Sequence, residues 1–306
     1  MELQTYLISN GYIPLDKSWI IRMGALDLLN GYKDLVIFLD KQENLGGDLN
    51  ALSRIAKVWD SDGPWDVGES GTIYRLVFWN NLKTGKPREI LTSGTLTLRC
   101  KNMDSSQSML CFNPEHLLKL DNQTSQWATM AYLHGDRRKV KNPPFKLQVT
   151  YDSVEHWEQQ RKKGKTWEAR ADPTLLAQAS AFLRKLSGKQ LDFNPEQAED
   201  YCFARAFGIL NAENGEKMFP SLIGHETNRI KEVEKAMDSY KKRAIIETDD
   251  HRVVQAIAML IKTDTHSSQE EVQSRFSNPG CVEKTWPKFW DFLADADNIL
   301  KKVSIA

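Results

Sequence analysis

The sequence predicts an α/β fold with two domains. Short apolar runs of strand length alternate with segments of helical apolar spacing along the whole chain, and this interleaving is typical of α/β proteins. The chain has 306 residues, about twice the roughly 150 residues of an average domain. No low-complexity linker divides it. The basic run Arg161–Lys165 is the nearest candidate for a flexible joint, and we interpret it as a solvated loop.

The strands are predicted from short apolar runs that contain β-branched or aromatic residues. These runs cover residues 34–39, 88–92, 145–151 and 244–248. Residues 48–59 instead have the apolar spacing of an amphipathic helix. Further helices are expected to begin near Thr72, Ser125, Pro173, Pro195, Arg229, His251 and Pro287.

The composition excludes several classes of protein. Lys and Arg number 41 and Asp and Glu number 41, so the formal net charge is zero, which argues against a general nucleic-acid or anionic-membrane binder. A hydrophobic content of 41% with 27% charged residues is that of a globular protein. No apolar run approaches the roughly 18 residues that span a bilayer, and Met1–Gln4 does not resemble the start of a secretory signal. We therefore expect a cytoplasmic protein.

The cysteines and histidines give no sign of a disulfide framework or a metal site. Cys100, Cys111, Cys202 and Cys281 are scattered, without a CxxC pair, so reduced thiols are expected. Because the His, Cys and carboxylate residues lack metal-ligand spacing, we predict neither a metal nor a cofactor.

Cations and hydroxyl side chains recur at predicted helix starts, where the helix dipole disfavours Lys and Arg. This pattern occurs at six positions, which are Lys17-Ser18, Arg75, Thr124–Gln126, Arg229, Arg252 and Lys284. Free backbone N–H groups with a nearby hydroxyl and cation make a ready site for phosphate or carboxylate. The alternative is that each arginine pairs locally with Glu69, Asp249 or Asp250.

Taken in order along the chain, the segments around these six positions resemble the motifs of the 5-enolpyruvylshikimate-3-phosphate synthase family. Its members are also called 3-phosphoshikimate 1-carboxyvinyltransferases. Pro14–Arg22 resembles the family's PxSKSxxxR, and Gly68–Arg75 is similar to G-N-A/S-G-T-x-x-R. Thr124–Gln126 is similar to S-S-Q, and Glu226–Arg229 is similar to K-E-T-D-R. Asp250–Arg252 resembles D-H-R, and Cys281–Phe289 resembles C-x-x-K-T/S-x-P-x-F. The shared order, which covers nearly the whole chain, carries the resemblance.

The resemblance implies a fold of two similar α/β domains built from βαβαββ units, with the active site in the cleft between them. Residues 1–16 with 171–306 would form the domain that binds phosphoenolpyruvate, and residues 17–170 the domain that binds shikimate 3-phosphate. The implied reaction transfers the enolpyruvyl group of phosphoenolpyruvate to the 5-hydroxyl of shikimate 3-phosphate and releases phosphate. It belongs to the shikimate pathway, which leads to chorismate and the aromatic amino acids, and the protein would act as a monomer.

The resemblance also implies a role for each motif residue. Phosphoenolpyruvate would be bound by Arg75, Arg229, Arg252 and Lys284, with Arg99 as a further candidate. Shikimate 3-phosphate would be bound by Lys17, Ser18, Arg22, Thr124, Ser125 and Gln126. Asp200 is the candidate base and Glu226 the candidate acid, and Lys17 would share in proton transfer.

Departures from the family pattern leave three alternatives open. Glu69 stands where the family has Asn, His225 where it has Lys, and Asn142–Phe145 is a loose version of S-K-P-Y, so the acceptor could be a different hydroxylated acid. The short chain raises a second possibility, a non-catalytic binding protein on the same scaffold. The third alternative is a related enzyme of the same fold and reaction type, a UDP-N-acetylglucosamine carboxyvinyltransferase. The loop cysteine of those enzymes would correspond to Cys100 or Cys111. Those enzymes lack the KTxP ending.

Overall fold

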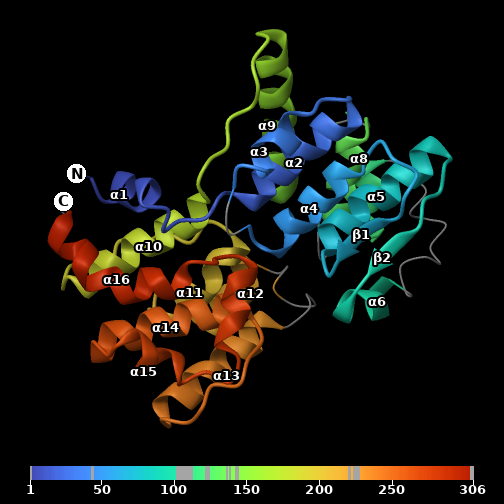
Figure 1. The fold of residues 1–306 in the computed structure, drawn as a ribbon. Coiled ribbons are helices and arrows are strands. Elements are labelled where there is room, and N and C mark those ends of the chain that lie inside the picture. Colours follow the sequence, from blue (N-terminus) through green and yellow to red (C-terminus); the bar gives the residue numbers. More distant parts are fainter. Residues whose placement is uncertain are drawn as a thin grey trace. The chain divides into compact units, whose positions relative to one another are not determined.

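The computed structural model divides the chain into two compact units (Figure 1). Unit 1 comprises Met1–Leu15 and Ala171–Ala306, and unit 2 comprises Asp16–Arg170. The residues that the structure describes are 2–42, 45–100, 113–120, 125–135, 137, 139–141, 145–219, 222 and 228–303. Which substrate each unit binds stays a prediction.

The predicted α/β fold is wrong. Helices account for 64% of the structure and strands for 4%. Across the described ranges the single sheet is a parallel pair, β1 (Trp65–Gly68) and β2 (Ile90–Thr92). A two-stranded sheet cannot supply the repeated βαβαββ units that the resemblance implies, so that fold is corrected to a predominantly helical one.

Two of the four predicted strands are helical. Residues 34–39 form α3 (Asp34–Leu39), and residues 145–151 begin α9 (Phe145–Lys162). Burial in α9 falls on Leu147, Tyr151 and Val154, which is the spacing of one helix face. Residues 244–248 contribute an isolated bridge between Ile246 and Phe276. Of the four predictions, only residues 88–92 contain a strand, β2.

Unit 2 is built on helices that pack around a core of large apolar side chains. The fully buried Trp65, Trp79, Ile20 and Met23 belong to this core. α2 packs on α9, α4 on β1, and α5 on α8. Besides α3 and α9, the helices of unit 2 are α2 (Lys17–Leu29), α4 (Gly47–Lys57), α5 (Gly71–Thr84), α6 (Gly94–Cys100), α7 (Pro114–Leu120) and α8 (Gln126–Leu133).

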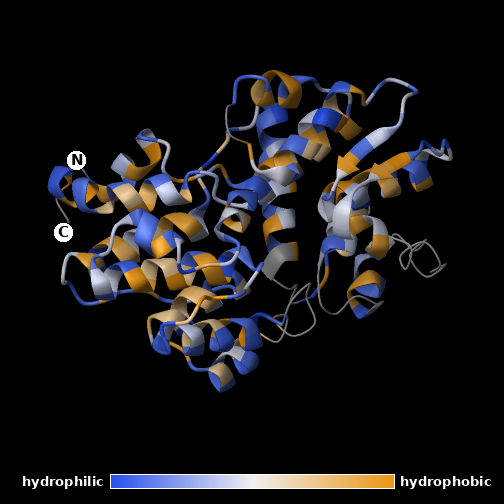
Figure 2. Cartoon of the chain, turned by 60° about the horizontal axis from the view of Figure 1, so that its bottom comes forward, coloured by the Kyte–Doolittle hydropathy of each residue, from blue (hydrophilic) through white to orange (hydrophobic). Residues whose placement is uncertain are grey.

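Unit 1 surrounds one central helix, α14 (His251–Thr265), which packs against α10, α11, α13 and α16 and the 3₁₀ helix η4. Val253, Ile257 and Met259 of α14 are fully buried. Hydrophobic residues form stripes along the helices (Figure 2), as amphipathic packing requires. The other elements are α1 (Leu3–Ser9), α10 (Pro173–Leu186), η2 (Ala198–Asp200), α11 (Tyr201–Ala206), α12 (Ala212–Met218), α13 (Arg229–Lys241), α15 (Gln269–Gln273), η4 (Pro279–Lys284) and α16 (Phe289–Lys302).

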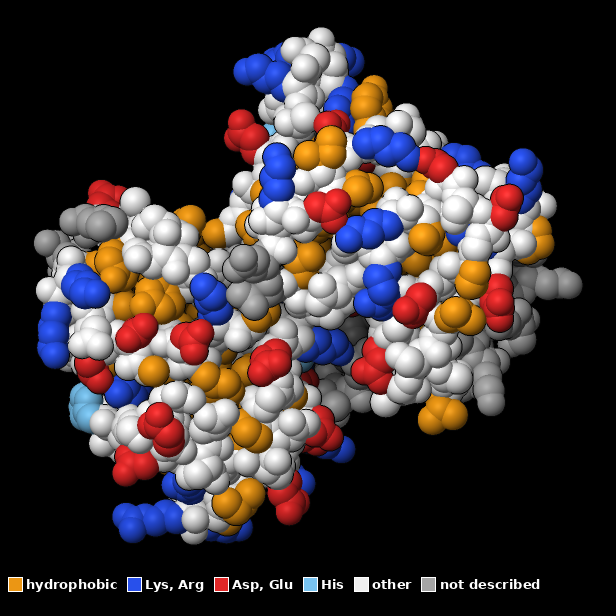
Figure 3. Space-filling view, in the orientation of Figure 1, with side chains coloured by type: hydrophobic (Ala, Val, Ile, Leu, Met, Phe, Trp, Pro, Cys, Tyr) orange, Lys and Arg blue, Asp and Glu red, His pale blue; other side chains and the backbone are white. Residues whose placement is uncertain are grey.

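The surface carries charges of both signs. On the face shown in Figure 3, basic and acidic side chains are intermixed. Among the helices that could be described, none has both the length and the hydrophobicity needed to cross a bilayer.

The buried His134 in unit 2 should make stability depend on pH. Burial lowers its pKa from the usual 6.5 to about 4. Between these values the unfolded chain takes up a proton that the folded chain does not, so stability is full above pH 6.5 and falls towards pH 4 by at most about 3 kcal/mol. Urea unfolding at pH 7.5 and pH 4.5 should show a smaller difference for His134→Gln than for the native chain. The exposed His116→Gln is the control, and an undiminished difference in His134→Gln would contradict the assignment.

Candidate anion-binding sites

In unit 1 the start of α14 is organised by the carboxylate of Asp250. Its Oδ1 accepts hydrogen bonds from the backbone N–H groups of Arg252 at 2.9 Å and Val253 at 3.4 Å. Its Oδ2 accepts a hydrogen bond from Nε of Arg229, the first residue of α13, at 2.8 Å. One carboxylate thus caps α14 and fixes an arginine beside the cap.

Arg252 supplies a buried donor at the same helix start. The residue is 7% exposed, and its Nη1 is buried with no hydrogen-bond partner among the residues that the structure describes. The guanidinium is always charged, and a buried donor without an acceptor costs roughly 1–3 kcal/mol. An acceptor from a bound anion would remove that cost, so Nη1 is the strongest indication of a ligand in unit 1.

Two free cysteines, Cys202 and Cys281, have thiol pKa values that are shifted by burial and by the charged residues near the start of α14. Burial raises the pKa of the Cys202 thiol to about 12, with Asp250 raising it further and Arg229 and Arg252 lowering it. Burial likewise raises the pKa of Cys281 to about 11, where Asp250 acts in the same direction and Lys284 opposes it. Both thiols are therefore protonated at neutral pH and poor nucleophiles.

Three of the four predicted phosphoenolpyruvate residues consequently lie around one helix start. Nε of Arg229 and the N–H of Arg252 both donate to the carboxylate of Asp250. Lys284 is exposed at the end of η4, which packs against α14. The local alternative, that the arginines pair with neighbouring acids, holds for Arg229 with Asp250.

Asp200, the candidate base, is buried in a turn of unit 1. Its Oδ1 accepts from Nε2 of Gln178 at 2.9 Å, and its Oδ2 accepts from the N–H groups of Glu196 at 3.1 Å and Gln197 at 3.2 Å. Burial raises the pKa of the carboxyl, and these hydrogen bonds oppose that rise. The two backbone bonds close the turn before α11, and the bond from Gln178 ties this turn to α10. The carboxylate therefore has a structural role. The candidate acid Glu226 and its neighbour His225 lie outside the described residues.

In unit 2 three helix starts meet at a carboxylate that the sequence did not single out. Nζ of Lys17, the first residue of α2, lies 2.8 Å from Oδ2 of Asp48 near the start of α4. The hydroxyl of Ser70, the N-cap of α5, donates to Oδ1 of Asp48 at 2.6 Å. An acid in a first helical turn is common, so no sequence signal distinguishes Asp48. Its partners lie 31 and 22 residues away.

Two further motif segments of unit 2 are joined by Arg75. Its Nη1 donates to the carbonyl of Gly71 at 2.8 Å and to Oε1 of Gln126, and the guanidinium lies 5.4 Å from the ring centroid of Trp127. Ser125, at the N-cap of α8, is 5% exposed, and within the described part of the chain its hydroxyl has no hydrogen-bond partner. Gly68–Arg75 and Ser125–Gln126 are therefore neighbours, while Thr124 lies outside the described residues.

The remaining predicted residues of unit 2 have other positions. Arg22 is 8% exposed and ties α2 to α9, donating from Nε to Oγ1 of Thr150 at 2.8 Å and from Nη1 to the carbonyl of Ser18 at 2.8 Å. The Ser18 side chain is exposed. Glu69, the departure in the glycine turn, accepts from the N–H of Thr95 at 3.2 Å. The side chains of Arg99 and Cys100, together with Cys111 and Asn142–Pro144, lie outside the described residues.

A comparison with protein-family models, curated proteins and solved structures found no match to this chain. The described residues contain no group of three or more His, Cys, Asp or Glu arranged to hold a metal ion. Each unit has cations and helix N-termini close together, at Arg229 and Arg252 in unit 1 and at Lys17 and Ser70 in unit 2.

Proposed function

We propose that the protein transfers the enolpyruvyl group of phosphoenolpyruvate to the 5-hydroxyl of shikimate 3-phosphate and releases phosphate, as a cytoplasmic enzyme. The protein would carry out this reaction on a predominantly helical fold. The observation that carries the proposal is the Nη1 of Arg252 at the start of α14, which is buried without a partner in the described part of the chain. Arg229 lies next to it, since Nε of Arg229 and the N–H of Arg252 both donate to Asp250. This arrangement supports binding of a small anion, and the ordered motifs support its identity.

The cluster in unit 1 suits phosphoenolpyruvate. The substrate carries a phosphate and a carboxylate, and both pair well with guanidinium groups. Arg229, Arg252 and Lys284 provide three cations beside the positive end of a helix of 15 residues. Asp250 holds Arg229 in place, so less ordering is needed when the anion binds.

The cluster in unit 2 suits a phosphorylated hydroxy acid. Lys17 and Arg75 offer positive charge, and the buried Ser125 hydroxyl offers a donor without a partner among the described residues. In the proposed reaction the methylene carbon of phosphoenolpyruvate gains a proton, and the substrate hydroxyl adds to the neighbouring carbon. Phosphate leaves the tetrahedral intermediate as the methyl carbon loses a proton. Glu226 and Lys17 are the proposed acids and Asp200 the proposed base.

The first experiment measures phosphate release from phosphoenolpyruvate with and without shikimate 3-phosphate, with mass spectrometry of the product. Acceptor-dependent release together with the enolpyruvyl product is expected. Release that occurs only with another hydroxylated acid, found with labelled phosphoenolpyruvate, would replace the acceptor. Binding by calorimetry without any release would support the non-catalytic alternative, which the three structural hydrogen bonds of Asp200 favour.

Arg252→Gln tests the anion site directly. The change removes the charge and the free Nη1 donor, so phosphoenolpyruvate should bind roughly 10- to 100-fold more weakly, as expected for loss of a hydrogen bond to a charged group. Calorimetric titration measures this effect, and circular dichroism checks the fold. The exposed Lys241→Gln on α13 should bind normally. Unchanged affinity in a folded Arg252→Gln protein would rule out this site.

A further inference from the structure

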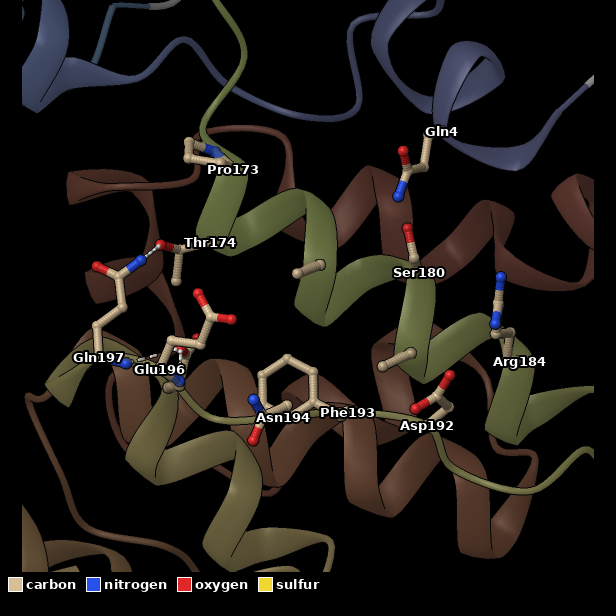
Figure 4. A pocket seen from close by; sticks show the side chains of 13 residues that line it. Gln4, Pro173, Thr174, Ser180, Arg184, Asp192, Phe193, Asn194, Glu196 and Gln197 are labelled. Carbon is tan, nitrogen blue, oxygen red and sulfur yellow. Dashed lines mark hydrogen bonds between the residues drawn. The ribbon is translucent and has the colours of Figure 1, made fainter. Parts of the chain in front are cut away.

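A pocket in unit 1 lies between one face of α10 and the segment 192–200 (Figure 4). Its volume is about 350 Å³, within the range of small-molecule sites. Thr174, Ala177, Ala181 and Arg184 line it from α10, at the spacing of one helix face. The two alanines leave space opposite Phe193. Asp200 touches the pocket, but Arg229, Arg252 and Lys284 are not among its lining residues.

The charges in the pocket are separated rather than paired. Arg184 and Asp192 lie at the same end, and the Glu196 carboxylate points into the other end, beside Thr174 and Gln197 (Figure 4). Across the described residues, no ion pair within 4.0 Å includes Arg184, Asp192 or Glu196. With Asp200, the lining holds three acids and one cation. The pocket is thus complementary to a ligand with net positive charge that also carries one anionic group.

We propose that this pocket binds a free basic α-amino acid, arginine or lysine. Its carboxylate pairs with Arg184 and its α-ammonium with Asp192. The aliphatic part of its side chain lies along Phe193, Ala177 and Ala181, and its terminal cation reaches Glu196. This ligand satisfies each unpaired charge of the pocket with a group of opposite sign.

The length of the pocket favours a long side chain. Thr174 and Arg184 are ten residues apart on α10, which is about 15 Å along a helix. Because helical side chains generally lean towards the N-terminus, the expected span from the Arg184 guanidinium to the Thr174 end is roughly 10 Å. A short amino acid placed between Arg184 and Asp192 would leave Glu196 without a partner. A diamine would reach Glu196 but would offer nothing to Arg184.

Calorimetric titration of the full chain with L-arginine tests the proposal. Agmatine, which lacks the carboxylate, and L-norleucine, which lacks the side-chain cation, serve as comparison probes. L-Arginine should bind, and both analogues should bind at least tenfold more weakly. Arg184→Gln and Glu196→Gln should each weaken L-arginine binding by roughly 10- to 100-fold, as expected for charge-assisted hydrogen bonds. The exposed Lys185→Gln, outside the pocket, should bind normally.

Three results would overturn the proposal: no binding of L-arginine or L-lysine to the native chain, equal binding of agmatine, or unchanged affinity in a folded Arg184→Gln protein. Among the described residues the two side chains make no ion pair, so the fold should persist in both variants, and circular dichroism verifies it. Because the readout is binding of an amino acid, its outcome is independent of whether phosphoenolpyruvate is turned over.

Discussion

Replacement of Lys284 by methionine is expected to lower the rate of phosphate release from phosphoenolpyruvate by roughly 100-fold or more. A fixed cation beside a developing negative charge stabilises the transition state, and removing one such group typically costs about this much. Lys284 stands at the end of η4 beside α14 and is exposed, so a methionine of similar length should leave the fold intact. Steady-state phosphate release and a thermal melt measure the two quantities.

The control for Lys284→Met is Lys301→Met, an exposed lysine near the end of α16. It removes the same charge from a position outside all the motif segments, so its rate should equal that of the native chain. A near-normal rate in a folded Lys284→Met protein would remove Lys284 from the proposed site. It would leave the assignment of Arg252 to be judged by its own binding experiment.

Several helix starts could be predicted because their signals are local. The helices expected near Pro173, Arg229 and His251 begin at those residues, so these three predictions are confirmed. In each case the preceding residue, Asp172, Asn228 or Asp250, caps the helix through its side chain. Such caps depend on residues within one turn, so the sequence alone contains the information.

Two of the predicted strands are helices because short apolar runs do not distinguish a strand from a buried helical turn. Residues 145–151 alternate like a strand, but the helical spacing becomes visible only when Val154 and Trp157 are included. The pairing of Asp48 with Lys17 and Ser70 was hidden for a different reason. These contacts join three helices, and no local pattern specifies which helices meet.

The basic run Arg161–Lys165 also differs from its interpretation as a solvated loop. The side chain of Arg161 is 14% exposed and pairs with Asp27 at 2.6 Å and Asp34 at 2.7 Å. Its guanidinium also lies 3.8 Å from the ring centroid of Tyr32. A charged residue in a basic run gives no indication of a buried partner that is 134 positions away.

That partner, Asp27, makes the strongest stability prediction. Its carboxylate is fully buried and accepts hydrogen bonds from the indole N–H groups of Trp157 and Trp167, each at 2.8 Å, and from Arg161. It thereby ties α2 to α9 and to the segment that follows. Asp27→Ala would leave two indole donors and a largely buried cation without this acceptor, and removing one partner of a buried pair costs roughly 3–5 kcal/mol.

Urea unfolding followed by tryptophan fluorescence should report this loss, since Trp157 and Trp167 both contact Asp27. Asp27→Asn keeps the shape of the side chain and one acceptor oxygen, so the decrease in its free energy of unfolding should be smaller. Asp60→Ala removes an exposed acid that pairs with Lys33, and such surface pairs contribute about 0–1 kcal/mol. If Asp27→Ala were no less stable than Asp60→Ala, the buried carboxylate would not hold these helices together. Their packing would then depend on the apolar contacts between α2 and α9 alone.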